Sequence, residues 1–511
     1  MHPFHHAAAN PDKPACILAS TGESVSYRDL EDASNQSANL IRYLGLKRGD
    51  VIAVMLENEL PLFEIAWGAQ RSGCYLTTVS TRLSARDISY ILQDAGCKIF
   101  IFSDNLAALA AEALACLPDV KGFGVHTGGD SYQSWKSLSA RQPKDRIVDE
   151  SAGTDMLYSS GTTGRPKGVR GPLPDGAIDA SIALMSMGCS LYGMDGDMVY
   201  LSTSPLYHAA PLRWAMLAHR LGATVVVMAK FDAEEALRLI QRYRVTHSTW
   251  VPTHFIRMLK LSEHVRAAYD LGSMRAVIHS AAPCPVEVKR QMIDWFGPII
   301  HEYYSGTEQC GITALDSEEW LRKPGSVGRA VIGKPKILDE DGHEVATGTV
   351  GQVFFADGSP FAYHNDPEKT ALAYNDRGWA TLGDIGYLDE EGYLFLTDRK
   401  HFMIISGGVN IYPQEIENAL VLHPKVNDVA VIGVPDEEMG EAVLAIVQPR
   451  EGVDGDDTVA EELRRFCREA VGAIKTPKRF LFRDTLPREA TGKLMKTKLI
   501  EEFRSGAAAP R

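Results

Sequence analysis

Short β-rich runs alternate with helical stretches along most of this chain, from Ile52 to about Asp398. Three apolar runs, at residues 198–201, 223–229 and 276–278, are typical of buried strands. Between the last two, residues 233–243 place Ala, Leu and Ile at helical spacing, with charges on the opposite face. Strands that alternate with amphipathic helices predict βαβ units and a layered α/β architecture.

After about Asp398 the pattern changes. Residues 429–434 and 442–447 are two short β-rich runs separated by Pro435-Asp436, which predicts a hairpin. A helix is expected over residues 461–471 and a further strand over residues 478–482. Since 511 residues exceed one ordinary core, we predict two domains. They are a large N-terminal α/β domain of residues 1–399 and a small α+β lid domain of residues 400–511.

Composition excludes several classes of protein. The net charge of −13 argues against a nucleic-acid-binding surface, which needs clustered Lys and Arg. No apolar run approaches the roughly 20 residues that span a bilayer, so we expect no integral membrane association. The N-terminal segment does not resemble a signal peptide, and its His2, His5 and His6 are expected to be solvated instead of binding a metal. These observations predict a cytoplasmic protein and leave a homodimer open.

Eight cysteines are scattered without a C-x-x-C pair. In a chain of this length, that pattern predicts reduced and mostly buried thiols. Cys284 and Cys310 flank motifs described below, and we interpret both as small hydrophobic side chains instead of reactive groups.

A loop rich in Ser, Thr and Gly follows an apolar run at Tyr158 and extends to Val169. Glycines let backbone N–H groups converge on phosphate oxygens, and hydroxyl groups and a lysine add further donors. The segment lacks the Walker A pattern, because Lys167 follows Pro166 and precedes Gly168. The expected phosphate-binding residues are Ser159, Ser160, Gly161, Thr162, Thr163, Gly164 and Lys167.

This loop resembles the signature of the adenylate-forming superfamily, which includes acyl- and aryl-CoA synthetases, peptide-synthetase adenylation domains and firefly luciferase. Further motifs occur in the family's order, so the resemblance covers nearly the whole chain. They are Pro205-Leu206-Tyr207-His208, Tyr304-Ser305-Gly306-Thr307-Glu308, the run from Gly378 to Asp384, Asp398-Arg399-Lys400 and Gly492-Lys493.

The resemblance implies a binding site for ATP. Glu308 corresponds to a Mg²⁺ ligand, as suits a hard carboxylate oxygen, and Thr307 to a residue that contacts the α-phosphate. Asp384 is expected to accept the ribose hydroxyls, and Arg399 to reach the ribose or the α-phosphate. Adenine is expected between Tyr304 and the segment Ala281-Ala282-Pro283.

Lys493 is implied as the principal catalytic residue. A carboxylate oxygen attacks the α-phosphorus, and an ammonium group that bridges both anions stabilises the transition state. Thr307, Glu308 and His208 are also expected to act in catalysis, with His208 as an aromatic gate. The acyl pocket is expected to contain His208, Ala209, Pro211, Trp214, Trp250, Ser305 and Gly306.

A second half-reaction is implied after rotation of the small domain. Ser406, Gly407 and Gly408 would then line a tunnel for the pantetheine arm of CoA, because small residues allow a thin chain to pass close to backbone. The hinge position is occupied by His401, where the family usually has Asp or Lys.

The sequence thus predicts an AMP-forming acid–CoA ligase that uses ATP, Mg²⁺ and CoA on a hydrophobic medium-chain, aryl or alicyclic acid. One alternative is a freestanding adenylation enzyme that loads a carrier protein. A more remote alternative is an inactive nucleotide-binding homologue, and luciferase-like oxidation is disfavoured. The acid itself is not specified by these residues.

Overall fold

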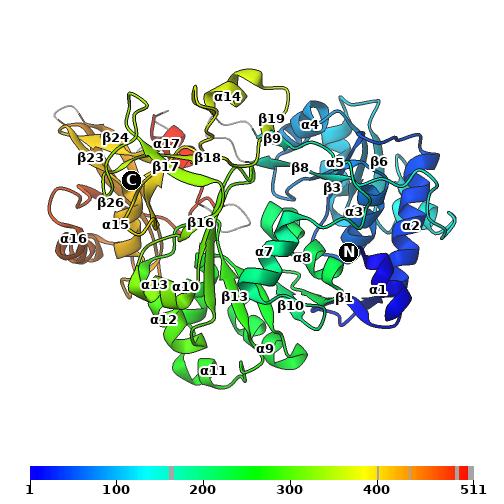
Figure 1. The fold of residues 1–511 in the computed structure, drawn as a ribbon. Coiled ribbons are helices and arrows are strands. Elements are labelled where there is room, and N and C mark those ends of the chain that lie inside the picture. The colour runs from blue at the N-terminus through cyan, green and yellow to red at the C-terminus, as the bar shows by residue number, and fades with distance from the viewer. Residues whose placement is uncertain (160–165, 400–401, 437–438, 489–493, 505–511) are drawn as a thin grey trace.

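The computed structural model describes residues 1–159, 166–399, 402–436, 439–488 and 494–504. The described strands form four sheets, of nine, eight, four and five strands. Figure 1 shows the C-terminal elements from β22 (Ile404–Ser406) onward grouped on the opposite side of the molecule from the N-terminus. The predicted α/β architecture with a smaller C-terminal α+β part is confirmed. The boundary after residue 399 remains a prediction.

The nine-stranded sheet has six central strands that pair in parallel, with antiparallel strands at its edges. In sheet order, its strands are β16 (Arg329–Ile332), β15 (Ile312–Leu315), β14 (Ile300–Tyr304), β13 (Ala276–His279), β12 (His247–Trp250), β10 (Val199–Ser202), β11 (Thr224–Val227), β1 (Pro14–Leu18) and β2 (Ser24–Ser26). The strands predicted from residues 198–201, 223–229 and 276–278 are therefore confirmed as β10, β11 and β13.

The eight-stranded sheet carries the predicted phosphate loop. Its β8 ends at Ser159, β9 begins at Lys167, and these two residues pair across the antiparallel ladder. In sheet order, its strands are β19 (Ala362–Tyr363), β9 (Lys167–Arg170), β8 (Thr154–Ser159), β4 (Tyr75–Thr78), β3 (Val51–Met55), β5 (Cys97–Phe102), β6 (Lys121–Gly124) and β7 (Gln133–Ser134).

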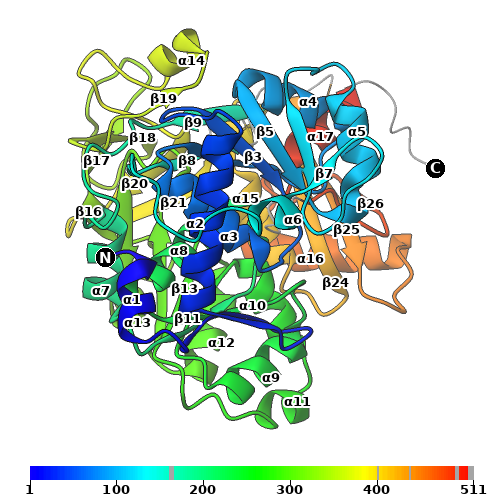
Figure 2. The ribbon, with the colours of Figure 1, turned by 90° about the vertical axis from the view of Figure 1, so that its right-hand side faces the viewer.

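Helices join the two large sheets into one core. The helices α2 (Tyr27–Tyr43), α3 (Pro61–Arg71) and α8 (Ala209–Leu221) share an apolar cluster with strands of both sheets, and Figure 2 shows α2 crossing in front of them. The other helices of the large part are α1 (Pro3–Ala9), α4 (Ala85–Asp94), α5 (Ala107–Leu114), α6 (Trp135–Ser139), α7 (Ala183–Tyr192), α9 (Ala233–Tyr243), α10 (Pro252–Leu259), α11 (Glu263–Ala267), α12 (Val286–Phe296), α13 (Ser317–Arg322) and α14 (Pro367–Leu372), with a 3₁₀ turn at Asp104–Leu106.

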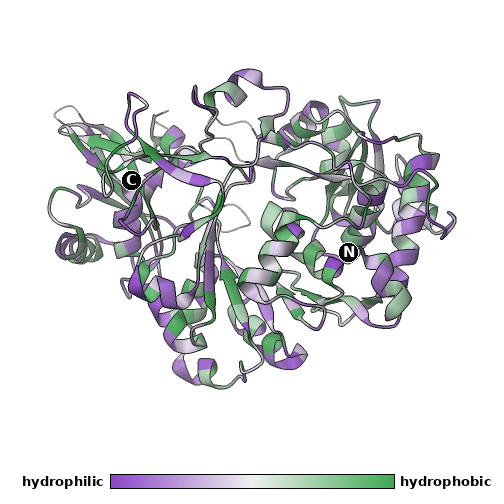
Figure 3. Cartoon of the chain, in the orientation of Figure 1, coloured by the Kyte–Doolittle hydropathy of each residue, from purple (hydrophilic) through white to green (hydrophobic). Residues whose placement is uncertain are grey.

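Apolar side chains follow the expected pattern. Figure 3 shows hydrophobic residues concentrated in the strands at the centre of the sheets, while outer helices such as α9 present hydrophilic faces. The bounds predicted for α9 agree with the structure, and Ala236, Leu237, Leu239 and Ile240 of this helix are buried. Burial of one apolar stripe is the main stabilising contribution of such a helix.

Two smaller sheets complete the fold. The four-stranded antiparallel sheet consists of β17 (Lys334–Leu338), β18 (Gly351–Ala356), β20 (Asp384–Leu388) and β21 (Leu394–Arg399). The C-terminal sheet consists of β23 (Val409–Ile411), β22, β25 (Gly440–Pro449), β24 (Val426–Asp436) and β26 (Arg479–Phe482). The helices around it are α15 (Pro413–Leu420), α16 (Asp457–Val471) and α17 (Lys496–Arg504).

The predicted C-terminal hairpin is confirmed as β24 and β25, but the predicted position of its turn is wrong. Pro435 and Asp436 lie within β24 and pair with Glu441 and Gly440. The hairpin therefore continues beyond the residues that the local pattern assigned to the turn, because the neighbouring apolar strand residues extend the ladder.

The expectation that the N-terminal histidines are solvated is wrong for His2, whereas His5 is exposed as expected and His6 is half-buried. His2 is fully buried, and its ring lies 4.8 Å from that of Trp67. The carbonyl of Met1 accepts a hydrogen bond from Arg220 Nη1 at 2.9 Å. His5 Nε2 lies 2.9 Å from Asp179 Oδ2 and is partly exposed, and His6 Nε2 lies 2.9 Å from the carbonyl of Arg220. Partners distant in the sequence thus hold this segment in place.

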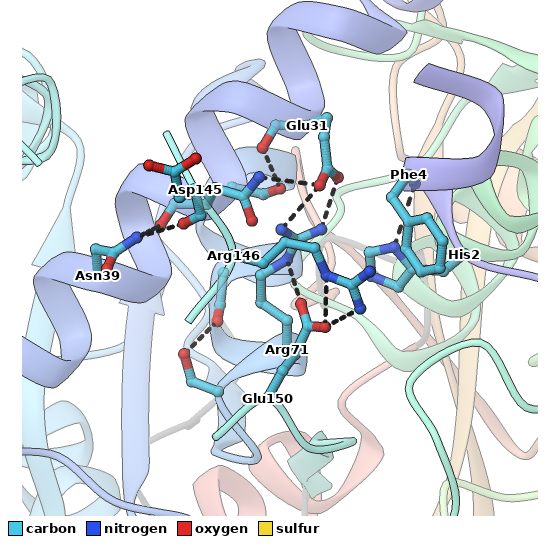
Figure 4. A network of polar contacts seen from close by, with 12 residues as sticks. His2, Phe4, Glu31, Asn39, Arg71, Asp145, Arg146 and Glu150 are labelled. Carbon is cyan, nitrogen blue, oxygen red and sulfur yellow. Dashed lines mark hydrogen bonds and ion pairs between the residues drawn. The ribbon is translucent and has the colours of Figure 1, made fainter. Parts of the chain in front are cut away.

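A polar network around the buried side chain of Arg71 lies beside this N-terminal segment (Figure 4). Arg71, whose side chain is fully buried, donates to both carboxylate oxygens of Glu31, at 3.1 and 2.6 Å. Arg71 Nε lies 3.6 Å from Glu150, which also accepts a 2.8 Å hydrogen bond from Arg146. The guanidinium of Arg146 in turn lies 4.4 Å from the centre of the Phe4 ring. We call Glu31, Arg71, Arg146 and Glu150 the N-terminal network.

All eight cysteines carry free thiols, as predicted, and Cys116 and Cys189 are exposed. Cys310 is buried, which raises the pKa of its thiol to about 12, and burial also raises the pKa of Cys284. Neither thiol is therefore favoured as a nucleophile. Among the described residues, no helix is both long and apolar enough to cross a membrane.

Candidate active site

A cavity of about 700 Å³ lies where the carboxyl ends of β12, β13 and β14 face the hairpin of β8 and β9. Ligand sites in α/β proteins commonly occupy this edge of a sheet. Fourteen of the predicted site residues line this one cavity. They are Ser159, Lys167, His208, Ala209, Pro211, Trp214, Trp250, Ala281, Tyr304, Ser305, Gly306, Thr307, Glu308 and Asp384. The structure therefore gathers motifs from distant parts of the chain, while the role of each residue remains a prediction.

Tyr363 connects two of the polar residues. Its hydroxyl donates to Glu308 Oε1 at 2.8 Å, and Lys167 Nζ lies 5.0 Å from the centre of its ring. At Gly306 a Cβ would lie 2.6 Å from Glu308 Oε2 and 2.8 Å from Leu382 Cδ2, so a larger residue here would displace the ends of these two side chains. Glu308 offers carboxylate oxygen of the kind that Mg²⁺ prefers, which fits the predicted metal ligand.

Tyr304 and Asp384 are joined by a direct hydrogen bond. The Tyr304 hydroxyl donates to Asp384 Oδ2 at 2.5 Å, and Asp384 is buried at the start of β20. Asp384 pairs with Arg399 in the ladder between β20 and β21. A buried carboxylate beside an aromatic ring is suited to hold the ribose and base of a nucleotide.

The opposite half of the cavity is largely apolar. Leu184 and Met187 of α7, Trp214 of α8, Tyr303 and Ile312 line this half. Trp214 Nε1 donates to the Tyr303 hydroxyl at 3.2 Å, and the two rings meet edge to face at 5.9 Å. This arrangement leaves an apolar and aromatic wall for the tail of a ligand.

His208 stands between the two halves at the N-terminus of α8. Its backbone is extended, with φ −94° and ψ 153°, and its ring lies 4.7 Å from that of Tyr207. Ala281 lies on the other wall with φ +75°, an unusual conformation for a residue with a side chain. Such strained positions cluster at ligand sites, which is consistent with the predicted contact to adenine.

Other predicted residues do not join this cavity in the structure. Ala282 and Pro283 are adjacent to Ala281 but do not line the cavity. Neither do Ser406, at the end of β22, or Gly407 and Gly408, in the turn that follows it. Several predicted positions lie outside the described residues, namely Ser160, Gly161, Thr162, Thr163, Gly164, His401 and Lys493. Their roles, like that of the Arg399 side chain, stay predictions.

Comparison with protein families decides the relationship. Residues 4–361 match the model of the AMP-binding enzymes, and residues 415–493 match that of the AMP-binding enzyme C-terminal domain. The chain belongs to the AMP-binding enzyme family. The predicted resemblance is thereby confirmed.

Individual AMP-binding enzymes resemble the chain over its full length. A long-chain-fatty-acid–CoA ligase, FadD13 of Mycobacterium tuberculosis strain H37Rv, is 32% identical over 508 residues, which cover 97% of each chain. A fatty acid–[acyl-carrier-protein] ligase, ScoC of Streptomyces coeruleorubidus, is 32% identical and covers 98% of this chain and 95% of its own. These relatives place the chain among the acid–thiol ligases.

A solved structure of the family supports the same arrangement. The ATP-bound crystal structure of MatB from Rhodopseudomonas palustris superposes with a TM-score of 0.81 at 27% identity. The superposition covers 99% of this chain and 100% of the MatB chain. The agreement extends over both the N-terminal and the C-terminal family matches.

Sequence reasoning missed several residues that line the site of this AMP-binding enzyme. Tyr363 lies between motifs, and only the pairing of β19 with β9 brings it to Lys167. Arg213 and Gln309 also line the cavity. Arg213 could have been found from its place between Pro211 and Trp214, two predicted pocket residues, because a charge in an apolar segment needs a partner.

Proposed function

We propose that this AMP-binding enzyme is an AMP-forming acid–CoA ligase. The single observation that supports this most strongly is the cavity, which joins Lys167, Thr307, Glu308 and Asp384 to an apolar half. A polar half suited to a nucleotide and an apolar half suited to an acyl tail meet near His208.

The proposed reaction has two steps. In the first, a carboxylate oxygen of the acid attacks the α-phosphorus of ATP, and the bond to pyrophosphate breaks. In the second, the CoA thiol loses its proton and attacks the acyl carbon, and AMP leaves with both electrons of the acyl–oxygen bond. Charge develops on phosphoryl oxygens in the first step, so positioned donors stabilise its transition state.

Each described residue has a proposed task in this reaction. Asp384 accepts the ribose hydroxyls, and Tyr304, held by its bond to Asp384, stacks on adenine. Thr307 donates to the α-phosphate, and Lys167 neutralises charge on the departing pyrophosphate. Glu308 would hold Mg²⁺, which supplies positive charge to the phosphates when bound.

We propose an acid with an apolar or aromatic tail. The wall formed by Leu184, Met187, Trp214, Tyr303 and Ile312 offers an apolar and aromatic surface against which such a tail can be buried. Burial of each CH₂ group in such a wall contributes about 0.8 kcal/mol, which favours medium or longer tails over acetate. The full-length similarity to a long-chain-fatty-acid–CoA ligase supports this proposal.

A carrier protein is the alternative acceptor, because ScoC is as similar to the chain as FadD13 is. For CoA, we propose that Gly407 and Gly408 approach the pantetheine arm after rotation of the small domain. Both have positive φ, 57° and 78°, and a Cβ at Gly407 would lie 2.4 Å from Met439 Cε. Glycine at both positions leaves the backbone accessible to a thin chain that passes close to it.

A substrate panel tests the proposal directly. Purified protein with Mg²⁺ and ATP is offered butanoate, dodecanoate, hexadecanoate and phenylacetate, and pyrophosphate release is measured. We expect release with at least one of the last three acids and thioester formation with free CoA. Release without thioester, restored by a carrier protein, would favour the alternative acceptor. No release with any acid would support an inactive homologue.

Two variants separate the half-reactions. Lys493→Ala is expected to abolish pyrophosphate release yet to form thioester from supplied acyl-adenylate, because the ammonium acts at the α-phosphate. His401→Pro is expected to impair the overall reaction while adenylate formation continues, because it restricts the proposed hinge. Normal pyrophosphate release by Lys493→Ala, or equal loss of both steps in His401→Pro, would contradict these roles in rapid-quench assays.

A further inference from the structure

A partly buried ion pair joins β8 to α8 at the wall of the cavity. Asp155 of β8 accepts from Arg213 Nε and Nη2, with both distances 2.7 Å. The two side chains are 19% and 18% exposed. A bidentate pair of this kind fixes the relative position of the two elements that carry it. One element leads into the predicted phosphate loop, and the other begins after His208.

The second edge of the same guanidinium faces the turn after β14. Arg213 Nη1 donates to the carbonyl of Thr307 at 3.5 Å. With the Gln309 amide oriented so that its oxygen faces the guanidinium, this oxygen lies 3.1 Å from Nη1 and 3.2 Å from Nη2. Arg213 therefore contacts the residue before Glu308 and the residue after it.

The turn that Arg213 contacts has an unusual backbone. Gln309 is exposed and has φ +54°, in the left-handed region that a residue with a side chain rarely occupies. Such a conformation persists only where surrounding contacts hold it. A backbone hydrogen bond from the Gln309 N–H to the Gly306 carbonyl at 3.1 Å closes this turn. Side-chain contacts add to it, from Arg213 on one side and, for Glu308, from the Tyr363 hydroxyl on the other.

We propose that Asp155, Arg213 and Gln309 form a positioning network for Thr307 and Glu308. Asp155 orients the guanidinium, which holds the 307–309 turn in register with the strand entering the phosphate loop. The network thus aligns the two parts of the chain that are proposed to contact ATP. This inference rests on the proposed function, because it assigns the network to the same nucleotide site.

The geometry disfavours recognition of a second substrate carboxylate by Arg213. Its Nε and Nη2 donate to Asp155, whose charge neutralises the guanidinium, and Nη1 faces Thr307 and Gln309. A recognition role would leave donors directed at the ligand. A positioning role should affect the KM for ATP, whereas recognition of the acid should affect the KM for the acid, so kinetics can separate the two roles.

The test compares three variants, Asp155→Asn, Arg213→Lys and Gln309→Ala, with the wild type. We expect the KM for ATP to rise and kcat for pyrophosphate release to fall, with the KM for the most active acid of the panel changing less than about twofold. The combined loss in kcat/KM for ATP should be on the order of tenfold to a hundredfold for Asp155→Asn, as for misplacement of reacting groups by about 1 Å. Gln309→Ala should show a smaller loss, and Asp155→Glu should recover part of the wild-type value.

Glu31→Gln is the matched control, because it also removes the carboxylate charge from a bidentate arginine pair but lies outside the cavity lining. Thermal unfolding is measured for every variant. We expect Glu31→Gln to lower Tm without changing the KM for ATP or kcat, whereas the network variants change both kinetic constants.

Binding of Mg²⁺ with α,β-methylene-ATP, followed by calorimetry, gives a second readout that needs no turnover. Weaker binding by Asp155→Asn than by Glu31→Gln supports the network even if no acid is activated and the proposed function fails. The proposal is overturned if the three variants lose Tm like the control but keep wild-type ATP kinetics and analogue binding. It is also overturned if their defect is confined to the KM for the acid, which would show that Arg213 reads the substrate.

Discussion

Two arginine–carboxylate pairs in this AMP-binding enzyme have similar local geometry but different surroundings. Arg71 and Glu31 form a bidentate pair within the N-terminal network, and the side chain of Arg71 is fully buried. Asp155 and Arg213 form a bidentate pair at the cavity wall and remain 19% and 18% exposed. The first pair joins α2 and α3 beneath the N-terminal segment, and the second joins the strand, the helix and the turn around the proposed nucleotide site.

The comparison teaches that the chemistry of a pair does not determine its role. Removing Arg71 leaves the carboxylates of Glu31 and Glu150, which are only 14% and 10% exposed, without their shared cation, so the main consequence is lost stability. At the cavity wall, the guanidinium also contacts the turn that lines the site, so the main consequence of its loss is a displaced turn. Surroundings and connectivity, and not the pairing itself, separate a stabilising pair from a positioning pair.

The largest effect on stability is expected for Arg71→Met. This change leaves Glu31 and Glu150 without their shared cation, which should cost about 3–5 kcal/mol of the free energy of unfolding. Urea unfolding of the variant and the wild type measures the change. The folded enzyme should keep its KM for ATP, and a raised KM at unchanged stability would remove the distinction between the two pairs.

The sequence predicts regular elements better than it predicts these pairs. The bounds of α9 and the positions of β10, β11 and β13 follow from local apolar periodicity, and fourteen of the predicted site residues line the cavity. Arg213 and Tyr363 were missed because their partners are brought to them by strand pairing and helix packing. Burial of His2 was missed for the same reason, since Trp67 and Arg220 are distant in the sequence.

A pH-dependent loss of stability is expected near the N-terminal network. His219 of α8 is fully buried, accepts from Trp67 Nε1 at 3.2 Å and lies 3.1 Å from the carbonyl of Ala15, and burial lowers its pKa to about 3. Its ordinary pKa is about 6.5, so between these values the unfolded chain binds the proton and the folded chain does not. Stability is therefore present above pH 6.5 and falls as the pH is lowered toward 3.

Replacing this histidine tests the contribution of one group. His219→Gln can keep both hydrogen bonds through its amide but cannot be protonated. Between pH 6 and 4, the slope of the free energy of unfolding against pH should then be smaller in the variant than in the wild type, by about 1.4 kcal/mol per pH unit. Urea unfolding at several pH values measures the slope. Equal slopes for the variant and the wild type would show that the buried ring is protonated in the folded state.

The smallest effect is expected for a pair that differs from both others in exposure. Arg238 and Glu235 on α9 also form an ion pair, but the arginine side chain is 56% exposed. Solvent screens such a pair, and water replaces its hydrogen bonds when one partner is removed. Arg238→Met, the same substitution as at Arg71, should leave the urea midpoint and the KM for ATP unchanged. A midpoint shift as large as that of Arg71→Met would mean that exposure does not separate the pairs, and the ordering by surroundings would then fail.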